Sequence, residues 1–166
     1  MLNKCIFAGL GNQGPTTPTN ILQCSEDFTS GLWVDESGVT KEGVSSVMDP
    51  FGLVRDIMEI SFQSVANSGL RYFFATPTDG LYVASVYVRT VSGVGNVRIA
   101  PDGANYSPNY QINESWTRIL HGPVATSAGF PRIIVQGSVT PNPNVYIFGA
   151  QLEPDRLTNY NATTCP

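Results

Sequence analysis

Few residues of this sequence have the chemistry of a catalytic or metal site. His121 is the single histidine, so a serine–histidine–aspartate nucleophile system would have to use it. It lies directly before Gly122-Pro123, where we expect an exposed turn at the end of a strand. A zinc site of three histidines is impossible, and no cysteine spacing supports a mixed site. The sequence therefore predicts neither a catalytic residue nor a metal site.

Acidic residues leave two weaker possibilities open. Glu26-Asp27, Asp35-Glu36 and Asp155 occupy predicted loops, and two carboxylates across a groove could hydrolyse a glycosidic bond. Glu26 with Glu153 or Asp155 could instead hold a structural calcium ion, which prefers oxygen ligands. Spacing along the chain does not decide between these alternatives and solvent-exposed loop residues.

One glycine-rich segment imitates a dinucleotide site. Gly9-Leu-Gly-Asn-Gln-Gly14 matches the G-x-G-x-x-G pattern, which requires a following helix to receive the pyrophosphate. Pro15-Thr-Thr-Pro18 follows instead and cannot begin that helix in register. We therefore interpret this segment as part of a flexible arm and predict no cofactor.

Composition excludes several classes of partner. The chain has 166 residues, which suits one domain with a real core, and a formal net charge of −4. Its arginines are scattered singly, so no basic stripe could follow a nucleic-acid backbone. No apolar run approaches the roughly 20 residues that span a bilayer. Charged residues make up 13%, against about 25% in typical domains. Such scarcity indicates either a surface covered by partners or a β surface rich in Ser, Thr and Asn.

The three cysteines make an odd count. Cys5, Cys24 and Cys165 lie near the chain ends and form no close pair. The simplest interpretation is a reduced protein made in the cytosol, and a Cys5–Cys24 bridge stays open.

Residues 1–19 differ in composition from the rest and are predicted to form an extended arm, because Gly, Pro and Thr crowd this span. Burial of each apolar anchor yields roughly 1.5–3 kcal/mol. Ordering each backbone residue costs about 1–2 kcal/mol. The arm therefore also needs main-chain hydrogen bonds to a neighbouring protein. The predicted anchoring residues are Leu2, Lys4, Ile6, Phe7 and Leu10.

The remainder, residues 20–166, reads as one domain of short strands. Val145-Tyr-Ile-Phe-Gly-Ala-Gln-Leu-Glu153 carries large side chains on both faces, so we expect a strand buried on both sides. Turns containing Gly or Pro separate most of the segments, which is typical of an all-β sandwich. Residues 56–65 also fit a helix. The other expected strands are 71–75, 81–90, 96–100, 116–120 and 132–136.

Aromatic residues could serve as stacking platforms for sugars. Those at strand positions, including both tryptophans, are more often core or interface residues. Tyr106 and Tyr110 lie in a loop rich in Pro and Asn. These two are the predicted surface contacts, with a protein partner or a glycan.

Several stretches together resemble jelly-roll domains of tailed-phage virion proteins. The opening motif of that family resembles Asn20-Ile-Leu22, Ser25-Glu-Asp-Phe28 and Trp33. Its central motifs resemble Ser85-Val-Tyr-Val-Arg89 and Trp116-Thr-Arg118. Its closing motif resembles Ile147-Phe-Gly-Ala-Gln-Leu-Glu153 with Thr158 and Tyr160. The resemblance spans residues 20–160 in the right order.

That family is similar to carbohydrate-binding modules, and its members occur in tail fibres, spikes and capsid decoration proteins. The resemblance implies a jelly-roll β-sandwich and a structural role in a virion. Our leading hypothesis is a capsid decoration, or cement, protein: made in the host cytoplasm, trimeric, and bound to the major capsid protein outside the shell through its arm. The alternative is a tail-fibre or spike module that recognises a host glycan. A small glycan hydrolase ranks third, so we expect a protein that is not an enzyme.

Overall fold

The computed structural model describes most of the chain beyond residue 19. Its described residues are 20–36, 38–62, 69–72, 79–102, 105–126, 134–137, 143–163 and 165. The predicted arm, with Leu2, Lys4, Ile6, Phe7 and Leu10, lies outside them, so its anchoring role stays a prediction.

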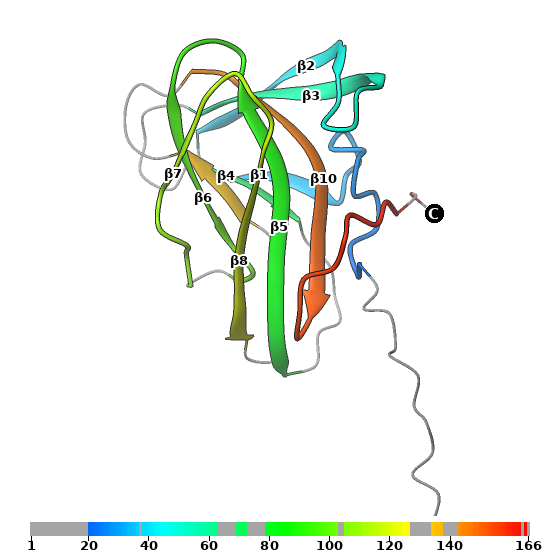
Figure 1. Ribbon diagram of the computed structural model, residues 1–166, viewed down its shortest axis with the longest axis vertical. Helices are drawn as coiled ribbons and strands as arrows, with labels where there is room; N and C mark the ends of the chain where they lie inside the picture. The colour runs from blue at the N-terminus through cyan, green and yellow to red at the C-terminus, as the bar shows by residue number, and fades with distance from the viewer. Residues whose placement is uncertain are drawn as a thin grey trace, which may run out of the picture.

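The described residues form ten strands in two five-stranded sheets, with antiparallel pairing throughout (Figure 1). Sheet A has the order β1 (Trp33–Glu36), β4 (Gly69–Tyr72), β9 (Ile134–Gly137), β6 (Gly95–Ala100) and β7 (Tyr110–Ile112). Sheet B has the order β2 (Val39–Met48), β3 (Val54–Phe62), β10 (Val145–Pro154), β5 (Gly80–Thr90) and β8 (Thr117–Thr126). In this part of the chain there is no helix, and hence none long and apolar enough to cross a membrane. The predicted all-β sandwich is confirmed.

β10 is the central strand of sheet B, between β3 and β5. Every residue from Val145 to Glu153 is buried, which confirms the expectation of a strand covered on both faces. Side chains such as Ile147 and Leu152 enter the main core, whereas Tyr146 and Phe148 belong to a second apolar cluster on the opposite face. Side chains outside the sandwich core therefore cover this second face.

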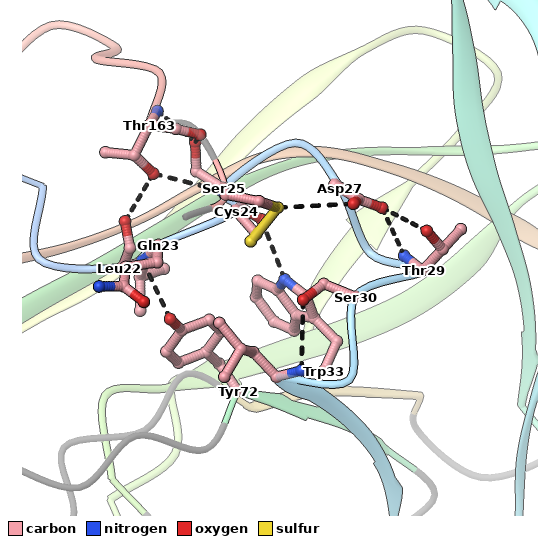
Figure 2. Close-up of a disulfide and its surroundings, with 12 residues drawn as sticks. Leu22, Gln23, Cys24, Ser25, Asp27, Thr29, Ser30, Trp33, Tyr72 and Thr163 are labelled. Carbon is pink, nitrogen blue, oxygen red and sulfur yellow. Dashed lines mark hydrogen bonds between the residues drawn. A yellow bond between two sulfur atoms is a disulfide. The ribbon is translucent and has the colours of Figure 1, made fainter.

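Trp33 belongs to the main core. Its ring lies 4.5 Å from the Phe28 ring and 5.0 Å from the Tyr72 ring, centroid to centroid. Trp33 Nε1 donates to the Cys24 carbonyl at 3.1 Å, and Tyr72 accepts a hydrogen bond from the Gln23 amide at 2.9 Å (Figure 2). Burial raises the pKa of the Tyr72 hydroxyl, so this group stays neutral and polar inside the core. The segment before β1 is thereby fixed onto the sandwich.

The C-terminal segment returns to the same place. Thr163 Oγ1 donates to the Leu22 carbonyl at 2.5 Å, and the Thr163 amide donates to Ser25 Oγ at 2.8 Å. Figure 1 shows this segment, coloured red, beside the blue one that precedes β1. A disulfide joins Cys24 to Cys165 (Figure 2). The expectation of reduced cysteines is therefore wrong for this pair, and Cys24 is not bridged to Cys5.

Several boundaries differ from those expected. Residues 54–62 form the strand β3, which settles the ambiguity between strand and helix. β8 continues past residue 120 to Thr126 by pairing with β5, so His121 lies within a strand and not in a terminal turn. β1, β2 and β7 were not expected, because two of them are very short and β2 is rich in Ser, Gly and charged residues.

Candidate functional site

Strand alternation places a set of polar and aromatic side chains on the face of sheet B that points away from the core. We call this surface the outer face. Cross-strand register arranges it in rows over β10, β5 and the strands that flank them. The first row is Glu59, Tyr146 and Arg89; the second is Phe148, Tyr87 and Arg118; the third is Gln151, Ser85 and Leu120.

Aromatic rings form a connected group on the outer face. Phe51 comes from the turn between β2 and β3, and its ring lies 5.6 Å from Tyr87 and stacks on Tyr160 at 5.5 Å. Phe148 lies beneath them, 5.7 Å from the Tyr160 ring and 6.4 Å from the Trp116 ring. These separations are typical of rings that attract one another through offset and edge contacts.

Arginines alternate with these rings. The guanidinium carbon of Arg89 lies 4.9 Å from the Tyr146 ring centroid and 5.3 Å from that of Trp116. Arg118 approaches Tyr87 at 5.5 Å, and Arg55 approaches Phe148 at 5.7 Å. Such contacts hold the charged groups close to the aromatic rings, where their outer N–H groups can still meet a ligand.

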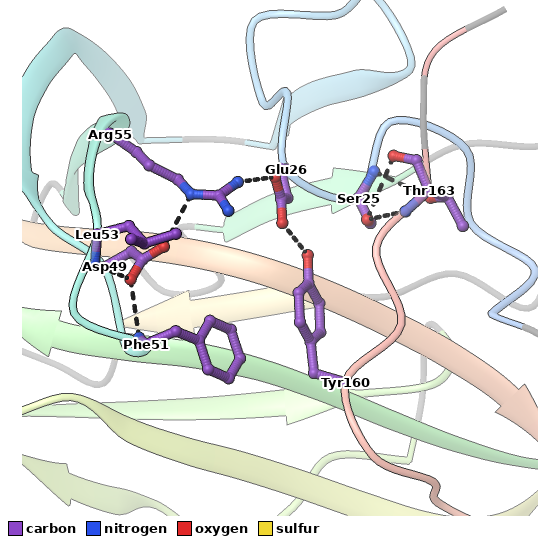
Figure 3. Close-up of polar contacts among 8 residues, drawn as sticks. All are labelled: Ser25, Glu26, Asp49, Phe51, Leu53, Arg55, Tyr160 and Thr163. Carbon is purple, nitrogen blue, oxygen red and sulfur yellow. Dashed lines mark hydrogen bonds and ion pairs between the residues drawn. The ribbon is translucent and has the colours of Figure 1, made fainter.

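A chain of polar contacts fixes the turn that carries Phe51 (Figure 3). Asp49 Oδ1 accepts the backbone amides of Phe51 at 2.8 Å and Leu53 at 2.9 Å. Asp49 Oδ2 lies 2.8 Å from Arg55 Nε, and Arg55 Nη1 lies 2.9 Å from Glu26 Oε2. Because Asp49 is only 2% exposed, this carboxylate holds the turn in place from within the structure.

The C-terminal segment covers part of the outer face and meets the Phe51 ring there. The Tyr160 hydroxyl donates to Glu26 Oε1 at 2.6 Å (Figure 3). Burial, followed by the hydrogen bond to Glu26, raises the pKa of the Tyr160 hydroxyl far above its usual value. Arg118 Nη1 donates to the Thr158 carbonyl at 3.0 Å, so this segment is held both to the segment before β1 and to sheet B.

Only some of the side chains on the outer face are accessible to solvent. Tyr146 and Phe148 are buried beneath their neighbours, whereas Phe51 is 53% exposed. Tyr87, Trp116 and Arg89 are half-buried. The arrangement can therefore offer apolar ring surfaces flanked by charged donors, which is suited to binding and does not by itself supply a reaction.

Of the acidic residues considered earlier, Glu26 takes part in the polar contacts that border the outer face. A groove of about 380 Å³ runs between residues 26–29 and the β2–β3 hairpin. Among the carboxylates that line it, Asp27 accepts bonds from Thr29, and Asp56 accepts one from Ser46 Oγ at 2.6 Å. Over the described ranges, no three acidic, histidine or cysteine side chains gather as metal ligands. Two of the residues considered as calcium ligands bind other groups instead. Glu26 pairs with Arg55 and accepts a hydrogen bond from Tyr160, and Glu153 accepts hydrogen bonds from Thr158.

Tyr106 and Tyr110 lie apart from the outer face. Tyr106 is contacted by Arg98 of β6, whose guanidinium carbon is 4.2 Å from the ring centroid. Tyr110 begins β7, packs against the main core and donates its hydroxyl to the Leu120 carbonyl at 2.5 Å. Both rings are half-buried, and their role as partner contacts stays a prediction.

The outer-face residues were present in the motifs but were not assigned as a site. In Ser85-Val-Tyr-Val-Arg89, alternation alone places Ser85, Tyr87 and Arg89 on one face. Nothing in the sequence indicates that Phe51 and Tyr160 meet above that face, because their contact depends on a turn and a returning C-terminal segment.

Comparison with known proteins places the fold. No protein-family model and no curated protein matches the sequence. A xylan-binding domain of carbohydrate-binding module family 22 superposes with a TM-score of 0.59 at 13% identity, covering 87% of this chain and 100% of that one. The family 22-1 xylan-binding domain of Paenibacillus barcinonensis Xyn10C gives 0.56 at 14%, covering 80% and 94%. The C-terminal family 22 module of Clostridium thermocellum Xyn10B gives 0.57 at 13%, covering 84% and 96%.

The described sandwich is thus a jelly roll of the kind found in carbohydrate-binding modules. At these identities the likeness establishes the fold alone. The three structures named above are carbohydrate-binding modules, and they support the predicted likeness in fold to such modules.

Proposed function

We propose that this chain is a glycan-binding module that takes an oligosaccharide on the outer face of sheet B. The observation that carries the proposal is the exposed ring of Phe51 beside Tyr87, with Trp116 and Arg89 on the same face. Sugar rings present apolar C–H faces that pack on aromatic rings, and their hydroxyls bond to charged side chains at the rim.

The fold supports the proposal independently of these residues. The structural neighbours include domains that bind xylan, and they share the jelly-roll sandwich with this chain. That likeness fits a binding protein better than a hydrolase. The capsid-decoration hypothesis, with its trimer and capsid partner, remains a prediction without support from these comparisons, and its anchoring arm lies outside the described residues.

The proposal is tested by a glycan array with the full chain, followed by titration calorimetry on each hit. Phe51→Ala is the sharpest variant, because this exposed ring contributes little to the core. We expect it to weaken saturable binding by about tenfold, the effect of losing one stacking ring. Tyr106→Ala removes an aromatic ring on β6's side of the sandwich and provides the matched control.

Two results would contradict this assignment. Saturable binding that Tyr106→Ala abolishes and Phe51→Ala leaves intact would move the site to the loop before β7. Absence of binding to every glycan on a broad array, by protein with an intact disulfide, would remove the function itself.

A further inference from the structure

The arginines of the outer face differ in how their positive charges are balanced. Arg55 is paired with two carboxylates, Asp49 and Glu26. Arg89 and Arg118 have no carboxylate within ion-pair distance in the described part of the chain. A charged group held against apolar rings without a counterion loses hydration that nothing nearby replaces.

Arg118 is nevertheless satisfied by neutral oxygens. It donates to Ser85 Oγ at 3.0 Å, to Gln151 Oε1 at 2.5 Å and to the Thr158 carbonyl at 3.0 Å. These contacts connect three parts of the fold. Arg118 therefore acts as a structural connector between sheet B and the C-terminal segment.

Arg89 is not satisfied in this way. Its Nη1 makes one long bond, 3.3 Å, to the Glu114 carbonyl, and its Nε is buried with no hydrogen-bond partner among the described residues. The carboxylates of Glu59 and Glu114 make no ion pair with Arg89 and bond to other groups. Glu59 accepts from Asn144 at 2.7 Å, and Glu114 accepts from the Gly93 amide at 2.8 Å.

Two aromatic rings restrict the position of this guanidinium. Its carbon lies near both the Tyr146 and the Trp116 ring, so the charged group is held at the outer face before any ligand arrives. A planar guanidinium that is held in place and makes no ion pair is suited to binding a carboxylate in a bidentate manner. Tyr87 lies two residues away on the same strand face, about 7 Å along β5, near the exposed ring of Phe51.

We infer that the glycan taken by the outer face is acidic, and that Arg89 binds the carboxylate of a uronic acid unit while the Phe51 and Tyr87 rings pack against a neighbouring sugar. This inference rests on the proposed function and specifies its ligand class. The chain as a whole is anionic, so selectivity for an acidic polymer comes from this local cation and not from net charge.

The test compares one polymer in two chemical forms. The full chain is titrated with polygalacturonate and with the same polymer after its carboxyls have been reduced to hydroxyls. We expect the carboxylate form to bind about tenfold more tightly or better, as a charge-assisted bidentate contact requires. Arg89→Gln should reduce binding of polygalacturonate to the level of the reduced polymer, and Arg89→Lys should restore only part of it. Arg98→Gln, which removes an arginine of sheet A that lies over the Tyr106 ring, should leave both affinities unchanged.

Equal affinity for the two polymer forms, measured on the unmutated chain, would overturn the inference while leaving the glycan-binding function intact. A second result would also overturn it: dextran sulfate binds as tightly as polygalacturonate, and Arg98→Gln weakens that binding as much as Arg89→Gln does. Such a result would show unspecific attraction between charges. Binding to neither form nor to any array glycan would instead refute the proposed function. The polymer comparison needs no variant, so it holds even if Arg89→Gln disturbs the fold.

Discussion

The ring of Tyr160 lies directly against the backbone of Gly149. A Cβ at residue 149 would stand 2.7 and 2.8 Å from two atoms of that ring, closer than such contacts occur. Gly149 has a φ of 60° and lies where the pairing of β10 with β5 shifts register, between Phe148 and Gln151. The irregularity in the central strand thus provides the space in which the C-terminal segment docks on the outer face.

Gly149→Ala should therefore destabilise the protein by two mechanisms. The left-handed backbone costs about 1–2 kcal/mol for a residue with a Cβ. Displacement of the Tyr160 ring adds about 1–3 kcal/mol. Gly52→Ala is the matched control, because its φ is 87° and a Cβ there would meet nothing within 4 Å.

Chemical denaturation of the two variants measures this difference. Adding Tyr160→Ala to each should relieve the second cost in Gly149→Ala and none of it in Gly52→Ala. Equal destabilisation by both glycine substitutions would show that the ring moves aside without cost.

The Cys24–Cys165 bridge should stabilise the fold by fastening the C-terminal segment. It closes a loop between cysteines 141 residues apart, and loss of a bridge of that kind costs about 2–5 kcal/mol. We expect Cys165→Ser, or reduction of the unmutated protein, to lower the melting temperature by similar amounts. Because the chain has three cysteines, Cys5→Ser is the control and should have little effect. Thiol titration of the denatured, unreduced protein should give one thiol per chain; three thiols would mean that the bridge does not form.

Tyr160 should make the fold sensitive to alkali. Its pKa is raised above the ordinary value of about 10.0, so the neutral hydroxyl is favoured in the folded state. The resulting stability is fully present below the pKa of the unfolded chain, and it is lost as pH rises from about 10 upward, since only the unfolded state then releases its proton. Tyr160→Phe should lose stability at neutral pH and fall less steeply above pH 10. Denaturation midpoints across this range check the slope; a variant that parallels the parent would place the alkaline sensitivity in Tyr72 or another group.

The sequence predicted the sandwich because its signals are local. Alternation in residues 81–90 and continuous bulk in residues 145–152 each reflect burial within one strand, and the Asp49-Pro-Phe-Gly52 turn was likewise readable. The site was not readable, because Glu26, Arg55 and Tyr160 meet only after three distant segments have folded together. The disulfide was not predicted for the same reason. It depends on the return of residues 155–163 beside residues 20–25, and that return has no sequence signature.

Asp49 links the stability of the β2–β3 turn to the proposed binding surface. Its Oδ1 holds the amides of Phe51 and Leu53, and its Oδ2 pairs with Arg55. Asp49→Ala removes both roles, so we expect a loss of about 1–3 kcal/mol in stability and, with Phe51 released, glycan binding as weak as that of Phe51→Ala. Asp49→Asn keeps an oxygen acceptor for the two amides and loses only the ion pair. It should therefore lower stability while largely preserving affinity. Calorimetric titrations and melting curves on the three variants separate the two contributions; if Asp49→Asn weakens binding as much as Asp49→Ala, then the Arg55 pairing, and not the turn geometry, positions the Phe51 ring.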